Sequence, residues 1–389
     1  MNKKQLSKKI VVTGGGSGGH ISAALSVISS LEEKYILEKN HFLYVGGDLG
    51  MEGEKPGNSL EQKLMKGKNF ECKYIRAGKL QRSFSFKTLG LLFRAFLGLI
   101  DSYKIIKEFK PDIVISTGGY VTVSVCLMAK LLKADIYLHE QTATVGLTNK
   151  IVGKLAKKIF ISFPSSLRYF PKERTVLTGN LVRPEIFETK AQGNFAENIK
   201  KLVGNRDRYP IIYISGGGLG SHLINETVKE SLKMLLQKYQ IILQTGDNKV
   251  FNDYKSVLNF KNNLEKELQS RFLPVTFIQA KDLGYLLHNI DLYIGRAGAN
   301  TVYEMGVLQI PSIFIPIPWV THNEQYKNAE VLVNLGLAEI IQEGELTSSC
   351  LLLRIEKFLN KDRTVDKEEI KKIFSIDANK RILKELNLI

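Results

Sequence analysis

The chain has 389 residues, which is long for a single hydrophobic core, so two domains are expected. Its composition, 44% hydrophobic and 24% charged, excludes a disordered or collagen-like chain. Lys and Arg number 55 against 39 Asp and Glu. The resulting net charge of +16 favours an anionic partner such as acidic lipid, nucleic acid or a phosphorylated substrate. The alternative explanation is that an AT-rich genome encodes many lysines.

The cysteines and histidines argue against a disulfide framework and against a zinc site. The three cysteines lack metal-type spacing, and the six histidines are scattered along the chain. The longest apolar stretch, residues 89–100, contains Arg94 and falls short of the roughly 20 residues that a membrane-spanning helix needs. We therefore expect a protein of a reducing compartment that is soluble or peripheral to a membrane.

Short β-branched runs alternate with longer amphipathic segments, a pattern typical of parallel sheets covered by helices. In the first half, helices are expected at 23–34 and 86–109. The predicted strands of that half lie at 10–12, 42–45, 113–115, 136–138 and 159–161. After a polar stretch at 194–208 the pattern restarts. The predicted strands of the second half lie at 210–215, 241–243, 275–278, 292–294 and 312–315.

This alternation predicts an α/β protein of two Rossmann-like domains. We place the N-terminal domain at 1–185 and the C-terminal domain at 186–365. The charged, helix-like stretch at 366–389 lacks a core of its own, so we expect it to pack back on the domains.

Three glycine-rich turns, at 14–20, 215–221 and 295–304, each follow a predicted strand and lead into a helix-like segment. Free amide groups at such a helix start attract phosphate. The first turn also satisfies G-x-G-x-x-G, but Asp48 comes late for the acidic residue of a dinucleotide site, which disfavours a dehydrogenase. Two domains around a diphosphate would use several such turns, whereas one Rossmann domain needs one. The alternative is that the glycine turns are purely structural.

Glu304 has two interpretations at this stage. Thr301 and Glu304 have the spacing of a capping box, in which the Glu side chain reaches back to a free backbone amide. Alternatively, the carboxylate accepts two hydrogen bonds from the diol of a ribose.

The segment at 89–109 has apolar residues around most of its girth, so as a helix it must bury two faces. Basic residues, Arg94 among them, surround this apolar stretch, a combination that suits an anionic membrane surface. The alternatives are a fully internal helix and a dimer contact. The membrane-facing residues expected from this pattern are Leu92, Phe93, Arg94 and Phe96.

Several short segments match one enzyme family in order and spacing from the first strand to about residue 345. They are Gly14 to His20, Ser116 to Val121, His139 to Gln141, Gly146 to Lys150, Thr178 to Arg183, Gln244 to Gly246, Arg296 to Glu304 and Gln325 to Ala329. With these segments the chain resembles the MurG family. That family makes lipid II by transferring N-acetylglucosamine (GlcNAc) from UDP-GlcNAc to undecaprenyl-pyrophosphoryl-MurNAc-pentapeptide, known as lipid I.

The resemblance implies a GT-B glycosyltransferase architecture, in which two Rossmann-like domains face each other across a cleft. The donor would lie mainly on the C-terminal half and the acceptor on the N-terminal half. Arg183 would lie by the nucleotide, Glu304 would take the ribose hydroxyls, and Ala280 would meet uracil through its backbone. The UDP-GlcNAc-binding residues implied are Ser17, Gly18, Gly19, Thr142, Arg183, Gly218, Ala280, Ala299, Asn300, Thr301, Glu304, Gln325 and Asn328.

Four positions depart from the family pattern. Thr142 stands where an asparagine is usual, and Gly218 stands where a serine hydroxyl often faces the diphosphate. Glu324 replaces the first of a frequent Gln-Gln pair, and Leu181 replaces a proline. The fold and the nucleotide site tolerate these changes, but a carboxylate beside the sugar alters its hydrogen-bond pattern and bears on the identity of the donor sugar.

The implied reaction is an inverting displacement at the anomeric carbon of GlcNAc by the 4-hydroxyl of MurNAc. His20 is the candidate general base, because its ordinary pKa suits proton transfer at neutral pH. The alternative is that His20 only orients the acceptor or the loop. Glu304 is the second residue to which a catalytic part is assigned. No metal or cofactor is expected, because helix amides and Arg183 would meet the charge of the leaving group.

Three rival functions are weighed. A UDP-sugar:diacylglycerol transferase keeps the fold and changes the acceptor. A UDP-sugar epimerase would need carboxylates around the sugar and no membrane patch. An RNA-binding protein would show aromatic and basic stacking surfaces, and no such motif is present, so nucleic acid is not an expected partner. The expected partners are UDP-GlcNAc, lipid I and an anionic membrane, at the cytoplasmic face of the cell membrane.

Overall fold

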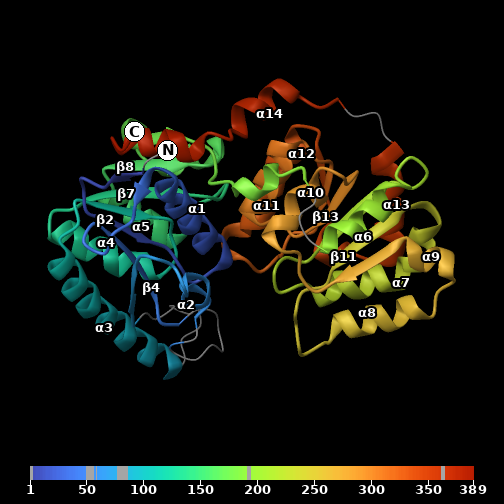
Figure 1. Ribbon diagram of the computed structural model, residues 1–389, viewed down its shortest axis with the longest axis horizontal. Helices are drawn as coiled ribbons and strands as arrows, with labels where there is room; N and C mark the ends of the chain where they lie inside the picture. The colour runs from blue at the N-terminus through green and yellow to red at the C-terminus, as the bar shows by residue number, and fades with distance from the viewer. Residues whose placement is uncertain (1–2, 50–56, 58, 77–85, 191–193, 361–363) are drawn as a thin grey trace. The chain divides into compact units, whose positions relative to one another are not determined.

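The computed structural model describes residues 3–49, 57, 59–76, 86–190, 194–360 and 364–389. The chain divides into two compact units (Figure 1). Unit 1 comprises Met1–Val182 together with Ser375–Ile389, and unit 2 comprises Arg183–Phe374. Each unit is an α/β domain built around a parallel sheet of its own.

The sheet of unit 1 has seven parallel strands in the order β5-β4-β2-β6-β7-β8-β9. Its central strands are continuous β-branched runs because helices cover both of their faces. The strands are β2 (Ile10–Thr13), β4 (Phe42–Gly47), β5 (Glu71–Ile75), β6 (Ile113–Ser116), β7 (Asp135–Glu140), β8 (Lys158–Ile161) and β9 (Thr175–Leu177). A separate two-stranded pair joins β1 (Lys4–Gln5) to β3 (Tyr35–Ile36).

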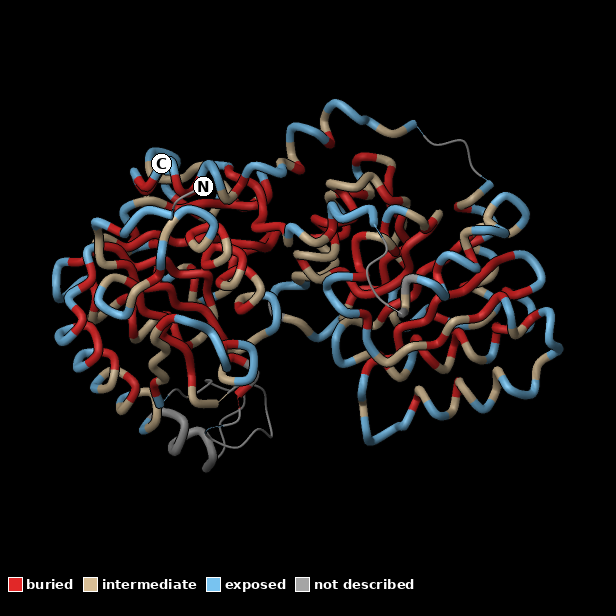
Figure 2. Tube along the Cα trace, viewed as in Figure 1, coloured by how far each residue is buried: buried red, intermediate tan, exposed pale blue. Residues whose placement is uncertain are grey.

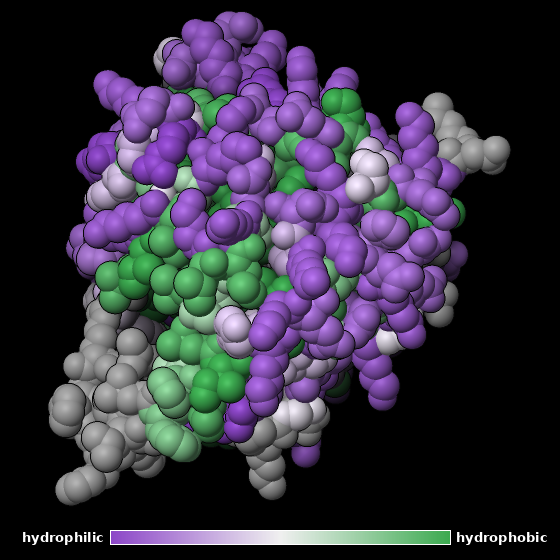
Figure 3. Space-filling view, turned by 90° about the vertical axis from the view of Figure 1, so that its left-hand side faces the viewer, coloured by the Kyte–Doolittle hydropathy of each residue, from purple (hydrophilic) through white to green (hydrophobic). Residues whose placement is uncertain are grey.

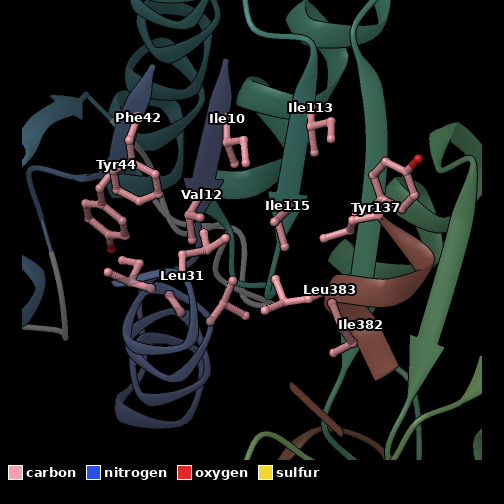
Figure 4. Close-up of a cluster of buried hydrophobic side chains, with 14 of the residues drawn as sticks. Ile10, Val12, Leu31, Phe42, Tyr44, Ile113, Ile115, Tyr137, Ile382 and Leu383 are labelled. Carbon is pink, nitrogen blue, oxygen red and sulfur yellow. The ribbon is translucent and has the colours of Figure 1, made fainter. Parts of the chain in front are cut away.

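Alternate residues of each strand point into two different cores of unit 1. On one face, Ile10 and Val12 of β2 pack with Leu31 of α1 and with Ile382 and Leu383 of α15 (Figure 4). The opposite face packs against α3, α4 and α5. The helices of unit 1 are α1 (Gly18–Lys34), α2 (Leu60–Met65), α3 (Phe86–Phe109), α4 (Val121–Leu131), α5 (Leu147–Leu155) and α15 (Ala378–Glu385).

The sheet of unit 2 has six parallel strands in the order β12-β11-β10-β13-β14-β15. These strands are β10 (Ile211–Ser215), β11 (Gln240–Gln244), β12 (Phe272–Val275), β13 (Leu292–Gly295), β14 (Ser312–Phe314) and β15 (Ala338–Ile340). The helices are α6 (Asn194–Val203), α7 (His222–Lys238), α8 (Asp253–Asn262), α9 (Lys266–Ser270), α10 (Ala280–Leu287), α11 (Ala299–Leu308), α12 (Glu324–Asn334), α13 (Ser348–Asn360) and α14 (Lys367–Ile373). In Figure 2 the strands of both sheets are buried, whereas the outer faces of the helices are exposed.

One predicted strand is displaced in the structure. The expectation was a strand at 275–278, but β12 spans Phe272–Val275 and includes Pro274. Because β12 is the edge strand of its sheet, a proline that donates no ladder hydrogen bond is tolerated there. The other predicted strands are present within a residue or two of their expected bounds.

The charged C-terminal stretch contributes to both units. Its first helix, α14, is part of unit 2, where Tyr303 Oη donates to the backbone oxygen of Ile373 at 3.0 Å and the Tyr303 ring lies 4.9 Å from that of Phe374. The second helix, α15, completes a core of unit 1. Among the described residues, no helix is both long enough and apolar enough to cross a bilayer.

Candidate active site

In unit 1 the first glycine turn lies against the turn that follows β6. The Gly15 amide donates to the backbone oxygen of Gly118 at 3.2 Å. Gly119 has a φ of +94°, and a Cβ built on it would lie only 1.8 Å from the Gly15 oxygen. The two turns approach each other this closely because both contain glycine.

His20 lies in the first turn of α1 and faces both of these loops. The helix begins at Gly18, and its N-cap residue Ser17 accepts a hydrogen bond from the His20 backbone amide. The imidazole Nδ1 is 2.9 Å from the Thr117 backbone oxygen and 3.0 Å from Oε1 of Gln141. Burial of the ring lowers the pKa of His20 below its ordinary value of 6.5. The ring is therefore neutral at physiological pH.

Behind His20, the end of β7 supplies a buried carboxylate. Glu140 accepts hydrogen bonds from the Thr142 amide at 2.9 Å, from Thr142 Oγ1 at 2.8 Å and from Asn149 Nδ2 at 2.8 Å. Burial raises the pKa of Glu140, although these hydrogen bonds oppose the shift. Thr142, which stands where the family pattern has an asparagine, thus donates twice to this carboxylate. A direct contact of Thr142 with the substrate stays a prediction.

One polar atom near His20 is unsatisfied. Asn149 is 3% exposed, and its Oδ1 is buried without a hydrogen-bond partner among the described residues. A Cβ built on Gly118 would lie 2.8 Å from this oxygen and 2.9 Å from Cε1 of His20. Because buried acceptors are normally satisfied, the Oδ1 of Asn149 is an exception in this part of unit 1.

In the glycine loop after β10 of unit 2, some positions can be occupied only by glycine, whereas others have room for a side chain. Gly220 has a φ of +78°, and a Cβ there would lie 1.8 Å from the Thr245 oxygen. By contrast, Gly218 is exposed, and a Cβ built on it meets nothing within 4 Å. The loop therefore has room at 218 for the serine that the family pattern leads one to expect.

Arg183 and Glu304 form the strongest ion pair of the candidate nucleotide site. Arg183 Nε donates to Glu304 Oε1 at 2.7 Å and Nη2 donates to Oε2 at 2.8 Å, a bidentate pair. The capping-box interpretation of Glu304 is wrong, because α11 begins at Ala299 with Gly298 as its N-cap. Thr301 is therefore already inside the helix, and the Glu304 carboxylate faces Arg183.

The amides that open α11 come from Ala299, Asn300 and Thr301, and the glycine cap before them has no side chain to occupy these donors. The loop just before them is fixed by two amides of α12. Gln325 Oε1 accepts from the Ala297 amide at 3.3 Å and from the Ile317 amide at 3.1 Å.

Asn328, the second of these α12 amides, is fully buried, and its Nδ2 donates to the Ala297 oxygen at 3.2 Å. Gln325 and Asn328 thus hold the loop that leads into α11. Recognition of sugar hydroxyls by the two side chains stays a prediction. Of the other predicted residues, Gly19 is exposed in the first turn of α1, and Ala280 is exposed at the start of α10.

Within the described part of the chain, one set of three side chains has metal-type proximity. The ligand atoms of His222, Glu226 and Asp253 lie within 4.8 Å of one another. These groups have partners inside the protein: His222 Nδ1 is 2.6 Å from Asp253 Oδ1, and Lys229 Nζ is 2.5 Å from Glu226 Oε2. Lys229 thus pairs with one of the two carboxylates, and His222 pairs with the other.

The exposed face of α3 is apolar around Phe93 and Phe96, whereas Lys104, Lys107 and Glu108 are exposed further along the helix. Phe93 and Phe96 are 63% and 58% exposed, and Ile100 follows on the same helix at 36%. Figure 3 shows apolar residues gathered on this side of unit 1. Arg94, expected to frame the patch, is bound to Asp48 at 2.6 Å. The side chain of Leu92 lies outside the described residues.

Known proteins match this chain along almost its entire length. Residues 10–161 match the glycosyltransferase family 28 N-terminal domain, and residues 211–386 match the glycosyltransferase family 28 C-terminal domain. A relative from Pediococcus pentosaceus is named UDP-N-acetylglucosamine--N-acetylmuramyl-(pentapeptide) pyrophosphoryl-undecaprenol N-acetylglucosamine transferase. It is 35% identical over 94% of this chain and 95% of its own. The chain belongs to this transferase family. A family member of the same name from Clostridium novyi is 32% identical, with 98% of each chain covered.

Solved structures show the same fold. The crystal structure of Acinetobacter baumannii MurG matches with a TM-score of 0.72 at 23% identity, over 98% of this chain and 100% of that chain. A UDP-N-acetylglucosamine 2-epimerase matches with a TM-score of 0.62 at 12% identity, over 99% and 96%. These likenesses confirm the predicted two-domain α/β architecture. Because one fold serves both activities, the function has to be argued from the site residues and from the family.

Sequence reasoning did not assign roles to three residues that surround His20: Thr117, Gln141 and Asn149. The available signal was their position. Thr117 and Gln141 directly follow β6 and β7 and lie two or three residues beyond the predicted strands at 113–115 and 136–138, and the carboxyl ends of parallel strands are where α/β domains place ligands.

Proposed function

We propose that this protein transfers GlcNAc from UDP-GlcNAc to the 4-hydroxyl of MurNAc in lipid I, which yields lipid II for peptidoglycan synthesis. The observation that carries the proposal is kinship with the transferase family over 94% of the chain at 35% identity. The polar side chains of the predicted site support it, because His20, Arg183 and Glu304 each have the surroundings that their roles require.

The donor would be held by unit 2. The ribose diol would bind Glu304, whose carboxylate keeps free lone pairs beyond the two that Arg183 occupies. The diphosphate would meet the amides of Ala299, Asn300 and Thr301 at the start of α11, where the helix dipole favours negative charge. Arg183 adds a fixed positive charge for the leaving UDP.

The acceptor would be activated by His20. As the MurNAc oxygen bonds to C1 of GlcNAc, its proton passes to the imidazole, the bond from C1 to the UDP oxygen breaks, and UDP leaves with the electron pair. The α-linked donor thus gives a β-linked product. A neutral imidazole is needed for this step, and the lowered pKa of His20 provides one.

The proposed location is the cytoplasmic face of the cell membrane, where UDP-sugars are made and lipid I is displayed. The exposed Phe93 and Phe96 of α3 would enter the interface of an anionic bilayer, and the net charge of +16 would strengthen this binding. Lys104, exposed on the same helix, would contribute to the attraction.

The direct test is turnover of radiolabelled UDP-GlcNAc with a short-chain lipid I analogue, with diacylglycerol offered in parallel. We expect transfer to the lipid I analogue. Transfer to diacylglycerol alone would refute the acceptor assignment and favour a glycolipid synthase. In His20→Ala and Glu304→Ala we expect transfer to be lost, because these residues carry the proposed roles.

A further inference from the structure

The amide of Gln141 has a single allowed orientation. This side chain is 2% exposed, and its Nε2 lies 2.8 Å from the Thr117 oxygen, 3.0 Å from the His139 oxygen and 3.2 Å from His139 Nδ1. All three are hydrogen-bond acceptors, so exchanging the nitrogen and the oxygen of the amide would set an oxygen against three acceptors. Oε1 of Gln141 must therefore face His20.

His139 fixes this orientation from behind. Its ring is fully buried, and Nε2 lies 3.1 Å from the backbone oxygen of Gly179. Because a carbonyl oxygen only accepts, Nε2 carries the hydrogen and Nδ1 is left as an acceptor for Gln141. Burial lowers the pKa of His139 to about 4, so the ring remains neutral and keeps this tautomer at physiological pH.

The tautomer of His20 follows from these contacts. Its Nδ1 faces two oxygens, the Thr117 backbone oxygen at 2.9 Å and Gln141 Oε1 at 3.0 Å. Neither oxygen can donate, so Nδ1 must carry the hydrogen. No hydrogen bond from the described residues reaches Nε2 of His20. The lone pair of the neutral ring is therefore on Nε2.

We infer that Gln141, oriented by His139, is a positioning residue that holds His20 in the Nδ1–H tautomer, so that Nε2 is the atom that accepts the proton of the attacking hydroxyl. This inference rests on the proposed function for the identity of the hydroxyl. In the reaction, the O–H bond of the acceptor breaks and an Nε2–H bond forms. The Nδ1 hydrogen stays in place between Thr117 and Gln141, and their two oxygens stabilise the resulting imidazolium.

The tautomer can be measured on the full-length protein without any substrate. In a sample labelled with ¹⁵N at histidine side chains, long-range ¹H–¹⁵N correlation distinguishes a protonated ring nitrogen from an unprotonated one. His20→Asn assigns the signals. We expect protonated Nδ1 and unprotonated Nε2 for His20, and the reverse for His139. An Nε2–H form of His20 in the unsubstituted protein would overturn the inference.

The variant that tests the role of the amide is Gln141→Leu, which leaves Thr117 as the one oxygen partner of Nδ1. Because Thr117 still accepts from Nδ1, we expect the Nδ1–H form of His20 to be weakened and not abolished, with a measurable Nε2–H population, a loss of kcat of about 10- to 100-fold and an unchanged KM for UDP-GlcNAc. If Gln141→Leu folds poorly, His139→Asn is the second test. It removes the ring that orients Gln141, so the tautomer of His20 should shift in the same direction. An unchanged tautomer and kcat in both variants would refute the inference.

A matched control is Gln240→Leu. Gln240 is a fully buried glutamine of unit 2 whose Nε2 also donates to two backbone oxygens, those of Leu202 at 2.9 Å and Tyr209 at 2.8 Å. This substitution should leave the His20 signals unchanged. The inference and the proposed function fail separately, because the tautomer is observed in the absence of lipid I. If His20 has the Nδ1–H form but no GlcNAc is transferred to lipid I, the proposed function is refuted and the tautomer assignment stands.

Discussion

Arg183 and Glu304 form a bidentate ion pair whose two members differ in exposure: the Glu304 side chain is 5% exposed and that of Arg183 is 38% exposed. The loss of Arg183 and the loss of Glu304 should therefore change the stability of unit 2 by different amounts. A buried carboxylate without its cation pays most of its desolvation penalty, whereas an arginine near the surface can be hydrated instead.

We predict that Arg183→Gln destabilises unit 2 by about 3 kcal/mol, because it leaves Glu304 buried and unpaired. Glu304→Gln should cost only about 1 kcal/mol, because the amide oxygen still accepts from Arg183. Urea unfolding, followed by hydrogen exchange in α11, measures both. Equal losses, or a larger loss for Glu304→Gln, would contradict the burial argument.

The pH dependence of transfer should report the neutral His20 ring. Burial holds the pKa of His20 below its ordinary value of 6.5, so the base form persists to lower pH than for a free histidine. We expect the acidic limb of kcat/KM against pH to lie below pH 6.5. A limb at or above pH 7 would mean that another group, or a charged His20, governs the rate.

His139 should make unit 1 sensitive to acid. The unfolded chain binds a proton at this ring near pH 6.5, whereas the folded protein binds it only near about 4. Stability is therefore complete above pH 6.5 and is lost as the pH falls towards 4, by about 3 kcal/mol for this one group. His139→Asn should flatten the change in unfolding free energy between pH 7 and 4.5. An unchanged slope would contradict the assignment of a neutral, buried imidazole.

Two glycines with opposite surroundings form a matched pair for stability. Gly119→Ala forces a Cβ onto the Gly15 oxygen at a positive φ, so we expect a loss of about 2 kcal/mol or more. Gly218→Ser places its side chain in open space and should change the unfolding free energy by less than about 0.5 kcal/mol. Thermal unfolding of both variants checks this, and similar losses would show that the turns are not packed as described.

Membrane binding should depend on the exposed aromatic residues of α3. Replacing both Phe93 and Phe96 by Asp removes two apolar side chains and adds negative charge, so we expect release from vesicles rich in anionic lipid. UDP binding should be unaffected. The control pair is Phe251→Asp with Val250→Asp, exposed apolar residues of unit 2. Co-sedimentation of the α3 variant at the level of the parent protein would exclude this surface.

The sequence predicted most accurately the strands that are buried on both faces of a sheet. Strands such as Ile10–Thr13 and Ile211–Ser215 are continuous apolar runs because helices cover both sides of a parallel sheet, and α3 begins and ends where its pattern indicated. The edge strands β5, β9 and β15 were not predicted because they are only partly buried, and β12 was displaced because it includes Pro274.

Within the site, the sequence indicated single residues more readily than their partners. The local capping alternative for Glu304 was plausible because Thr301 has the required spacing, yet the true partner, Arg183, is 121 positions away in the chain. The same holds for His20, which meets Thr117 and Gln141 only after three strands have been placed side by side. Periodicity encodes local structure, whereas such pairs depend on topology.

The division of unit 1 into two stretches of chain bears on how the protein is synthesised. Residues 375–389 supply Ile382, Leu383, Leu386 and Leu388 to a core whose strands were made more than 200 residues earlier, whereas unit 2 is continuous. On the ribosome, unit 2 can therefore complete its fold while the sheet face of unit 1 that α1 and α15 share is covered by α1 alone. A nascent chain stalled before α15 would be a natural client for chaperones that shield such surfaces.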